Sequence, residues 1–308
     1  MISIKAPKRV TKNNIQEFIL KFGHTFNWKK KMVPNQLIDL SEIEEIDILG
    51  LLIIYKYIDF TYANYCFKKP ELKVDKYLLE TWDKYAFRDL IESYIHNENK
   101  SDRPFKKLKI TSNDRFIIAP QALLRESKFT NENIQKAFIP KIESYYKKNS
   151  KKTDVIFSCF SEIILNFWEH AVLDTKSIII ADGNNDKIEI ACADTGNGLF
   201  SNLRGVLDSK IKDDAILEKS VTKGVTSKPN TFHMGYGLWI VNQLVTANMG
   251  KLHLYSEGYF YQNNYGKIKK GRSPFWPGTI IYVNLSLKKP KSLADLDLIS
   301  SNIKINFK

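Results

Sequence analysis

The stretch SEIILNFWEHAV, Ser161–Val172, combines an apolar helical pattern with a regular row of polar side chains. Glu162, Asn166 and His170 recur every fourth residue, so on a helix they form one stripe. The remaining side chains are mostly apolar, which is typical of a buried helix. Burying a polar group without a partner costs on the order of 1–3 kcal/mol. We therefore expect polar atoms against this stripe, either from the protein core or from a ligand.

Two glycine-containing motifs follow this stretch. An alternating strand, Lys187–Ala193, runs directly into DTGNG at residues 194–198. Residues 199–234 are rich in Ser, Lys, Asp, Asn and Gly, and a span of that length is typical of a functional lid or a disordered loop. GYG at residues 235–237 then opens a helical pattern. A later alternating strand, Gly278–Leu287, begins with Gly-Thr.

Taken in this order, ExxxNxxxH on a helix, DTGNG after a strand, GYG opening a helix and the Gly-Thr strand resemble the Bergerat ATP-binding fold of the GHKL superfamily. That superfamily includes gyrase-type ATPases, heat-shock chaperones, histidine kinases and mismatch-repair ATPases. The resemblance covers residues 105–288 and implies an α/β (α+β) sandwich in which helices cover one face of a mixed sheet. A P-loop nucleotide site is excluded, because the chain has no GxxxxGK[ST] motif.

The resemblance implies that ATP and Mg²⁺ are the cofactors. Asp194 is expected to accept a hydrogen bond from the adenine amino group, although an aspartate at this position also suits a turn cap. Gly196 and Gly198 would let the backbone pass close to the base and ribose. Asn166 would offer Mg²⁺ a neutral oxygen ligand. Thr279 matches the family's strand threonine near adenine, and β-propensity alone also explains a threonine there.

The expected phosphate end of the site lies at GYG. Gly235 and Gly237 would leave amide groups at a helix N-terminus, where anions bind readily, or simply form a loop-to-helix turn. By resemblance, Glu162 would orient and deprotonate the attacking water, which contributes roughly 10²–10⁴-fold to a rate. Lys223 and Lys228 in the lid are candidate phosphate ligands or ordinary solvated lysines.

The motif on this helix fits two subfamilies, which differ in whether His170 or Glu169 belongs to the pattern. ExxxNxxxH, which includes His170, resembles the anti-sigma-factor serine kinases, whereas Asn166 followed by Glu169 resembles gyrases and chaperones. We expect an ATP-binding switch protein that hydrolyses MgATP slowly and couples lid closure to partner binding. The alternatives are a serine/threonine protein kinase of the anti-sigma type and a non-catalytic nucleotide-sensing module. A histidine kinase is disfavoured, since no histidine lies in a recognisable phosphoacceptor helix.

An N-terminal α/β domain is expected before the ATP-binding domain. IDLSEIEEIDILGLLII, residues 38–54, resembles the strand-loop-helix signature of STAS domains, and a generic α/β domain is the alternative. Ile48-Leu49 stands where that family has its phosphorylatable serine, so we expect a docking or dimerisation module. The predicted organisation is a STAS-like partner-binding domain at residues 1–100, a GHKL domain at 101–288 and an irregular tail at 289–308.

Composition limits the partners. The chain has 308 residues and a formal charge of +13, with lysines spread along the sequence, so nucleic acid is a possible but not a favoured partner. We expect an unidentified protein partner at the N-terminal domain and keep a homodimer open. No signal peptide or run of membrane-spanning length is apparent, which predicts a cytoplasmic protein without membrane contact. Three cysteines without CxxC spacing indicate neither a disulfide framework nor a zinc site.

Overall fold

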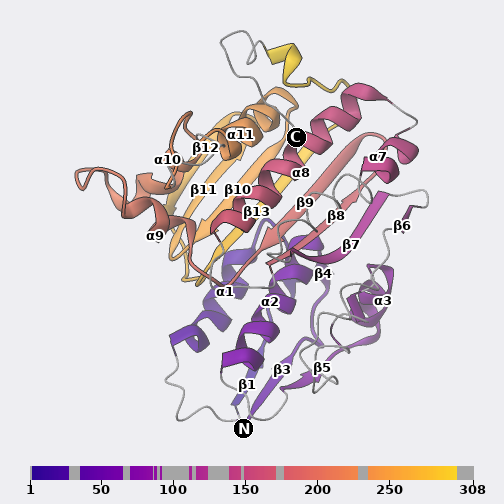
Figure 1. Cartoon of the computed structure of the whole chain (residues 1–308). Helices are drawn as coiled ribbons and strands as arrows, with labels where there is room; N and C mark the ends of the chain where they lie inside the picture. Colours follow the sequence, from indigo (N-terminus) through magenta and orange to yellow (C-terminus); the bar gives the residue numbers. More distant parts are fainter. Residues whose placement is uncertain are drawn as a thin grey trace.

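The computed structural model describes residues 2–27, 35–64, 70–85, 87–88, 91, 111–112, 116–123, 139–146, 149–170, 177–227 and 235–296. These residues form a mixed α/β structure, the α+β class that the sequence predicted (Figure 1). One large sheet carries helices on both faces, and a small three-stranded sheet lies in the N-terminal region. None of the described helices has the length and apolarity needed to span a bilayer.

The large sheet has the strand order β12-β11-β10-β13-β9-β8-β7-β6. Its strands are β6 (Thr111–Ser112), β7 (Phe116–Leu123), β8 (Ser177–Gly183), β9 (Lys187–Ala193), β10 (Lys251–Ser256), β11 (Tyr259–Asn264), β12 (Lys267–Arg272) and β13 (Thr279–Ser286). Every pairing in it is antiparallel, which differs from the mixed sheet that we expected. The order places β13 between β9 and β10, so β9, which Asp194 directly follows, lies beside the strand that begins at Thr279.

Helices α8 (Ser150–His170) and α11 (Gly237–Ala247) lie against each other across one face of this sheet (Figure 1). The apolar core on this side contains Ile190 and Cys192 from β9 together with Ile163 and Val241 from the two helices. Three shorter helices flank this layer: α7 (Ile139–Tyr145), α9 (Leu199–Arg204) and α10 (Ile216–Ser220). Over its described part, the segment predicted as a lid or a disordered loop contains α9, the 3-10 turn η3 (Asp213–Ala215) and α10, which differs from the second of those two expectations.

The N-terminal region is built on parallel strands. The order β1-β3-β5 forms the small sheet, and a short β2-β4 pair lies apart from it. The elements are β1 (Ile2–Lys5), β2 (Arg9–Val10), α1 (Ile15–Phe22), η1 (Gly23–Asn27), β3 (Gln36–Asp39), β4 (Glu45–Ile46), α2 (Ile48–Asn64), β5 (Glu71–Lys73) and α3 (Lys76–Lys84). Parallel strands need crossover connections, and the helices supply them.

Helix α2 covers the second face of the large sheet. It contacts β8 and β9, and its apolar side chains share one core with Ile178, Ile180 and Ala191 from those strands. A helix that is apolar on nearly all sides is expected when sheet and helix neighbours surround it. The regions predicted as residues 1–100 and 101–288 therefore share a continuous core. The predicted linker at residues 97–104 lies outside the described residues.

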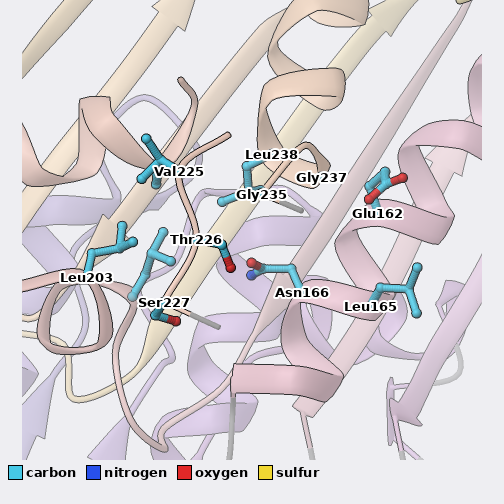
Figure 2. Close-up of a pocket in the computed structure, with 12 residues that line it drawn as sticks. Glu162, Leu165, Asn166, Leu203, Val225, Thr226, Ser227, Gly235, Gly237 and Leu238 are labelled. Carbon is cyan, nitrogen blue, oxygen red and sulfur yellow. The ribbon is translucent and has the colours of Figure 1, made fainter. Parts of the chain in front are cut away.

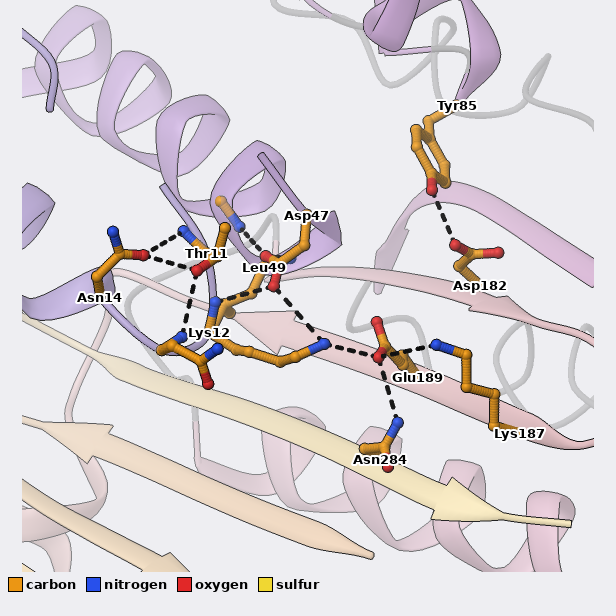
Figure 3. Close-up of polar contacts among 12 residues, drawn as sticks. Thr11, Lys12, Asn14, Asp47, Leu49, Tyr85, Asp182, Lys187, Glu189 and Asn284 are labelled. Atoms are coloured by element: carbon orange, nitrogen blue, oxygen red, sulfur yellow. Dashed lines mark hydrogen bonds and ion pairs between the residues drawn. The ribbon is translucent and has the colours of Figure 1, made fainter. Parts of the chain in front are cut away.

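A polar cluster joins the two regions at the edge of this core (Figure 3). The Lys12 ammonium donates to Glu189 Oε1 at 2.7 Å, and Asn284 Nδ2 donates to the same oxygen at 3.2 Å. Asp47 accepts from the backbone N–H of Lys12 at 2.9 Å and from that of Gly50 at 3.0 Å, which caps the start of α2. Burial is the main cause that raises the pKa of the Asp47 carboxyl. The cluster fixes where the N-terminal region lies on the sheet.

Candidate functional site

A small pocket, partly open to solvent, lies between α8, the start of α11 and the segment 199–227 (Figure 2). Glu162 and Asn166 line it from α8, and Gly235 and Gly237 line it from the other side. The sequence predicted each of these four residues as part of one site. Two residues four apart on a helix project from the same side, which explains why Glu162 and Asn166 reach one pocket.

Glu162 lies directly against the first residue of α11. A Cβ built on Gly237 would be 2.7 Å from Glu162 Oε2, closer than real Cβ contacts allow. A side chain at position 237 would therefore push this carboxylate away from the helix N-terminus. Burial, and secondarily the negative charge of Glu162, raises the pKa of the Cys159 thiol one turn earlier on α8. A buried thiol with a raised pKa is a poor nucleophile, so Cys159 is a core residue.

The start of α11 has the properties of an anion site. Its N-cap residue, Tyr236, makes no side-chain capping bond, and the N-terminal end of a helix carries partial positive charge. Gly235 has φ +74°, in the left-handed region that glycine favours. Its Cβ would lie 2.7 Å from the backbone of Gly224 and Val225, and its carbonyl accepts from the Gly224 N–H at 3.1 Å. Gly235 thus holds both ends of the 224–235 segment together beside the pocket.

Asp194 lies in a second cluster and does not line the pocket. Its side chain accepts from the Gly196 N–H at 2.7 Å and from the Thr279 N–H at 3.2 Å. The residue is only 2% exposed. Gly278 has no room for a Cβ, which would lie 2.3 Å from Asp194 Oδ1. The carboxylate therefore acts in this structure as the turn cap that the sequence left open as an alternative.

Leu199 connects the two clusters. Its N–H donates to Thr279 Oγ1 at 2.9 Å, while Leu199 itself lines the pocket. The preceding residue, Gly198, is the N-cap of α9 and passes close to Glu257. A Cβ on Gly198 would be 2.2 Å from Glu257 Oε2. That carboxylate accepts from the Ser201 N–H at 2.7 Å and from its hydroxyl at 2.6 Å. The predicted glycine therefore serves the placement of α9.

Lys223, a predicted phosphate ligand, does not line the pocket. Lys223 lies with its ammonium 5.3 Å from the centre of the Trp239 ring and 5.8 Å from that of Tyr236, in cation–π geometry. Lys228 lies outside the described residues. His170 is the last residue of α8, and its side chain is likewise outside the description.

The sequence reasoning missed the hydroxyl groups of the pocket. Ser220, Thr226 and Ser227 line it, and Figure 2 shows Thr226 pointing toward Asn166. The signal was present as a run of Ser and Thr on both sides of Lys223. It was overlooked because hydroxyl residues in a long connecting segment are typical of turns. These groups add hydrogen-bond donors and acceptors next to the predicted amide.

The residues of the pocket suit a magnesium ion that shares its ligands with a phosphate group. Among the described residues, no three His, Cys, Asp or Glu side chains gather in a way that could hold a metal alone. The pocket instead offers the Asn166 amide and the Glu162 carboxylate beside a helix N-terminus. Mg²⁺ is commonly bound by one or two protein oxygens, with substrate phosphates and waters completing the shell. The donor set therefore fits this ion.

The geometry leaves two neighbouring clusters, one with Glu162 and Asn166 at the start of α11 and one with Asp194 at Thr279. Only the first forms the pocket wall. Comparison of the chain with protein-family models, with curated proteins and with solved structures finds no match.

Proposed function

We propose that this chain is a GHKL-type ATPase of the Bergerat fold, which binds MgATP in the pocket between α8 and α11 and hydrolyses it slowly. One observation carries the proposal: Glu162 and Asn166 line the same pocket as the glycine-opened start of α11. In the proposed switch, closure of the segment 199–234 over the nucleotide changes the grip on a protein partner. The order of the elements along the chain supports the proposed ATP-binding fold. Helix α8 with the polar stripe comes first, then the hairpin β8–β9, the lid, helix α11, and strands β10 and β13.

Charge favours a cation between Glu162 and a bound phosphate. The Glu162 carboxylate lies directly beside Gly237, at the helix start where a phosphate would bind. The carboxylate and the phosphate are both negative and would repel each other at such a short distance. Asn166, one turn further along α8, offers a neutral oxygen on the same side. Bound Mg²⁺ would supply charge neutralisation and Lewis acidity toward the phosphates. The role of Asn166 is then to hold the ion, and that of Glu162 is to orient and deprotonate a water.

Adenine binding requires the described arrangement to open. Asp194 is 2% exposed, and its two oxygens accept backbone bonds from Gly196 and Thr279. Leu199 and Leu203, both from α9, occupy the wall of the pocket. In the proposed complex α9 moves away so that the edge of the base reaches Asp194 beside Thr279. Segments that open for a ligand are usually among the least stable parts of a fold. Helix α9 has only 6 residues, which is consistent with such an opening.

Two substitutions separate binding from hydrolysis. Glu162→Gln should keep MgATP affinity within about threefold and lower phosphate release by roughly 10²–10⁴-fold, the usual contribution of a general base. Asn166→Ala should weaken binding in the presence of Mg²⁺. Glu143→Gln, on the exposed side of α7, is the matched control and should change neither quantity.

Isothermal titration calorimetry with a non-hydrolysable ATP analogue and a phosphate-release assay are the measurements. Equal phosphate release from the wild type and from Glu162→Gln would contradict hydrolysis at this site. Transfer of phosphate to a co-purified protein, without release to solvent, would replace hydrolysis by kinase activity.

A further inference from the structure

The hairpin β11–β12 ends the large sheet and presents a basic face that the ATP-binding proposal does not use. In an antiparallel sheet, directly paired residues project from the same face. Lys267 pairs with Asn264, which pairs with Lys251 on β10, so these three share one face. Lys269 pairs with Gln262 and lies on that same face. It is the face that the N-terminal region covers further along the sheet.

The positive charge on this face is not neutralised. Lys267 and Lys269 are exposed, and neither forms an ion pair within the part of the chain that the structure describes. Lys270, which follows Lys269 and projects from the opposite face, pairs with Glu218 of α10. Lysine on an edge strand commonly prevents edge-to-edge pairing of sheets. That role does not explain why the unpaired cations extend inward to Lys251 on the third strand.

An exposed aromatic ring stands at the tip of the hairpin. Tyr265 is 51% exposed, and its φ of +58° lies in the left-handed region that a bulky side chain rarely adopts. The Lys251 ammonium lies 5.2 Å from the centre of the ring. Asparagine and glycine are the usual residues of such tight hairpin turns, so a tyrosine here lowers the stability of the turn. The ring is held at the surface beside the basic face.

Two amides lie between the cations in fixed orientations. The amino group of Gln262 donates to the Tyr255 hydroxyl at 2.8 Å, and the side-chain oxygen of Asn264 meets His253 Nε2 at 2.9 Å. Both residues are partly exposed. Their remaining polar atoms, an oxygen on Gln262 and an amino group on Asn264, make no hydrogen bond within the described residues. The face thus offers one acceptor and one donor at set positions.

We propose that this face, formed by Lys251, Gln262, Asn264, Tyr265, Lys267 and Lys269, binds single-stranded nucleic acid. Lysines that track a phosphate backbone, together with an aromatic ring on which a base stacks, are the two components of single-strand binding. The fixed amides suit hydrogen bonds to base edges. A membrane surface would be served by charge and apolar anchors instead, and a polar sheet face between the lysines lacks such anchors. This inference is independent of the proposed ATPase.

Fluorescence anisotropy with a labelled oligothymidylate of about 20 nucleotides tests the proposal on the full chain. The double variant Lys267→Gln/Lys269→Gln should lower affinity about 25-fold at about 0.1 M salt, and the slope of log K against log salt should become shallower by about 1.4. The matched control Lys270→Gln/Lys76→Gln removes the same charge from other surfaces and should lower affinity less than about threefold. Tyr265→Ala should weaken binding at least about fivefold, and Tyr77→Ala, an exposed tyrosine on α3, should not.

Three results would overturn the proposal. The first is no binding of the oligonucleotide at low salt. The second is equal weakening by the two lysine pairs, because attraction to the overall +13 charge then explains the binding. The third is tighter binding to anionic phospholipid vesicles, or to duplex DNA, than to the single strand. Circular dichroism melting curves of all variants should coincide, since every substituted side chain in the test lies at the surface.

Discussion

The substitution Gly237→Ala tests the geometry of the pocket with a single added methyl group. The new Cβ would be 2.7 Å from Glu162 Oε2, and ordinary contact begins near 3.4 Å, so the carboxylate must withdraw by about 0.7 Å. A misplacement of about 1 Å at a catalytic group costs on the order of 10²-fold in rate. We therefore expect phosphate release to fall about 100-fold.

The same substitution should not harm the fold. Gly237 is the first residue of α11 and does not have the positive φ that only glycine tolerates, so alanine should raise stability by about 0.5–1 kcal/mol. Loss of activity in a protein of equal or higher Tm would thus locate the effect at Glu162. Phosphate release at saturating MgATP and thermal unfolding are the two measurements.

Gly205→Ala is the matched control, because its Cβ would meet no heavy atom closer than 3.8 Å and the residue has φ −69°. It should leave phosphate release unchanged. Full activity of Gly237→Ala, with the Glu162 side chain in its original position, would refute the role assigned to this carboxylate.

Three further predictions concern contacts that hold the fold together. Gly198→Ala should lower stability by about 1–3 kcal/mol, since its Cβ displaces Glu257 and breaks the capping of α9; thermal unfolding measures this. Lys12→Met should cost about 2 kcal/mol in urea unfolding, because it leaves the largely buried Glu189 carboxylate without its closest cation. Burial lowers the pKa of His253 to about 4, whereas a histidine in the unfolded chain has a pKa of about 6.5. Between these two pH values the unfolded chain binds a proton that the native protein does not bind, so stability should fall by up to about 3 kcal/mol from pH 6.5 to 4.

Each of these predictions has its own control. Adding Glu257→Ala to Gly198→Ala should cost little beyond Gly198→Ala alone, because the clash and the cap involve the same carboxylate. Lys12→Met combined with Glu189→Gln should cost less than the sum of the single changes, and strict additivity would contradict direct coupling of the pair. In His253→Gln the decrease in stability between pH 6.5 and 4 should shrink, and an unchanged pH dependence would assign it to other groups.

Much of the large sheet could be predicted from local patterns. Strand Lys187–Ala193 has the bounds that its sequence indicated, and β13 (Thr279–Ser286) lies within the predicted strand Gly278–Leu287. The hairpin β11–β12 was missed, because KIKKGR has no apolar alternation and its turn contains Tyr265 in place of the usual asparagine. The α9 segment was predicted as part of a lid or disordered loop, since its N-cap residue Gly198 has no side chain and the carboxylate that accepts from its first turn belongs to Glu257, far along the chain. A cap formed by tertiary contact leaves no local signal.

The site was predictable to the extent that helix periodicity controls it. The spacing of Glu162 and Asn166 placed both on one side of α8, and the glycine at the start of α11 faces them. The distance between Asp194 and the pocket wall depends on how the segment 199–227 packs, which no periodicity encodes. The docking of the N-terminal region on the sheet was also not predictable, because an apolar α2 indicates burial without indicating the partner surface.

The central claim is most directly tested by a crystal structure of the chain with a non-hydrolysable ATP analogue and Mg²⁺. We expect the phosphates at the start of α11 by Gly235 and Gly237, the ion beside Asn166, and adenine within hydrogen-bond distance of Asp194. A nucleotide bound elsewhere on the chain, or an Asp194 that keeps its bonds to Gly196 and Thr279 while adenine lies in another cavity, would contradict the account.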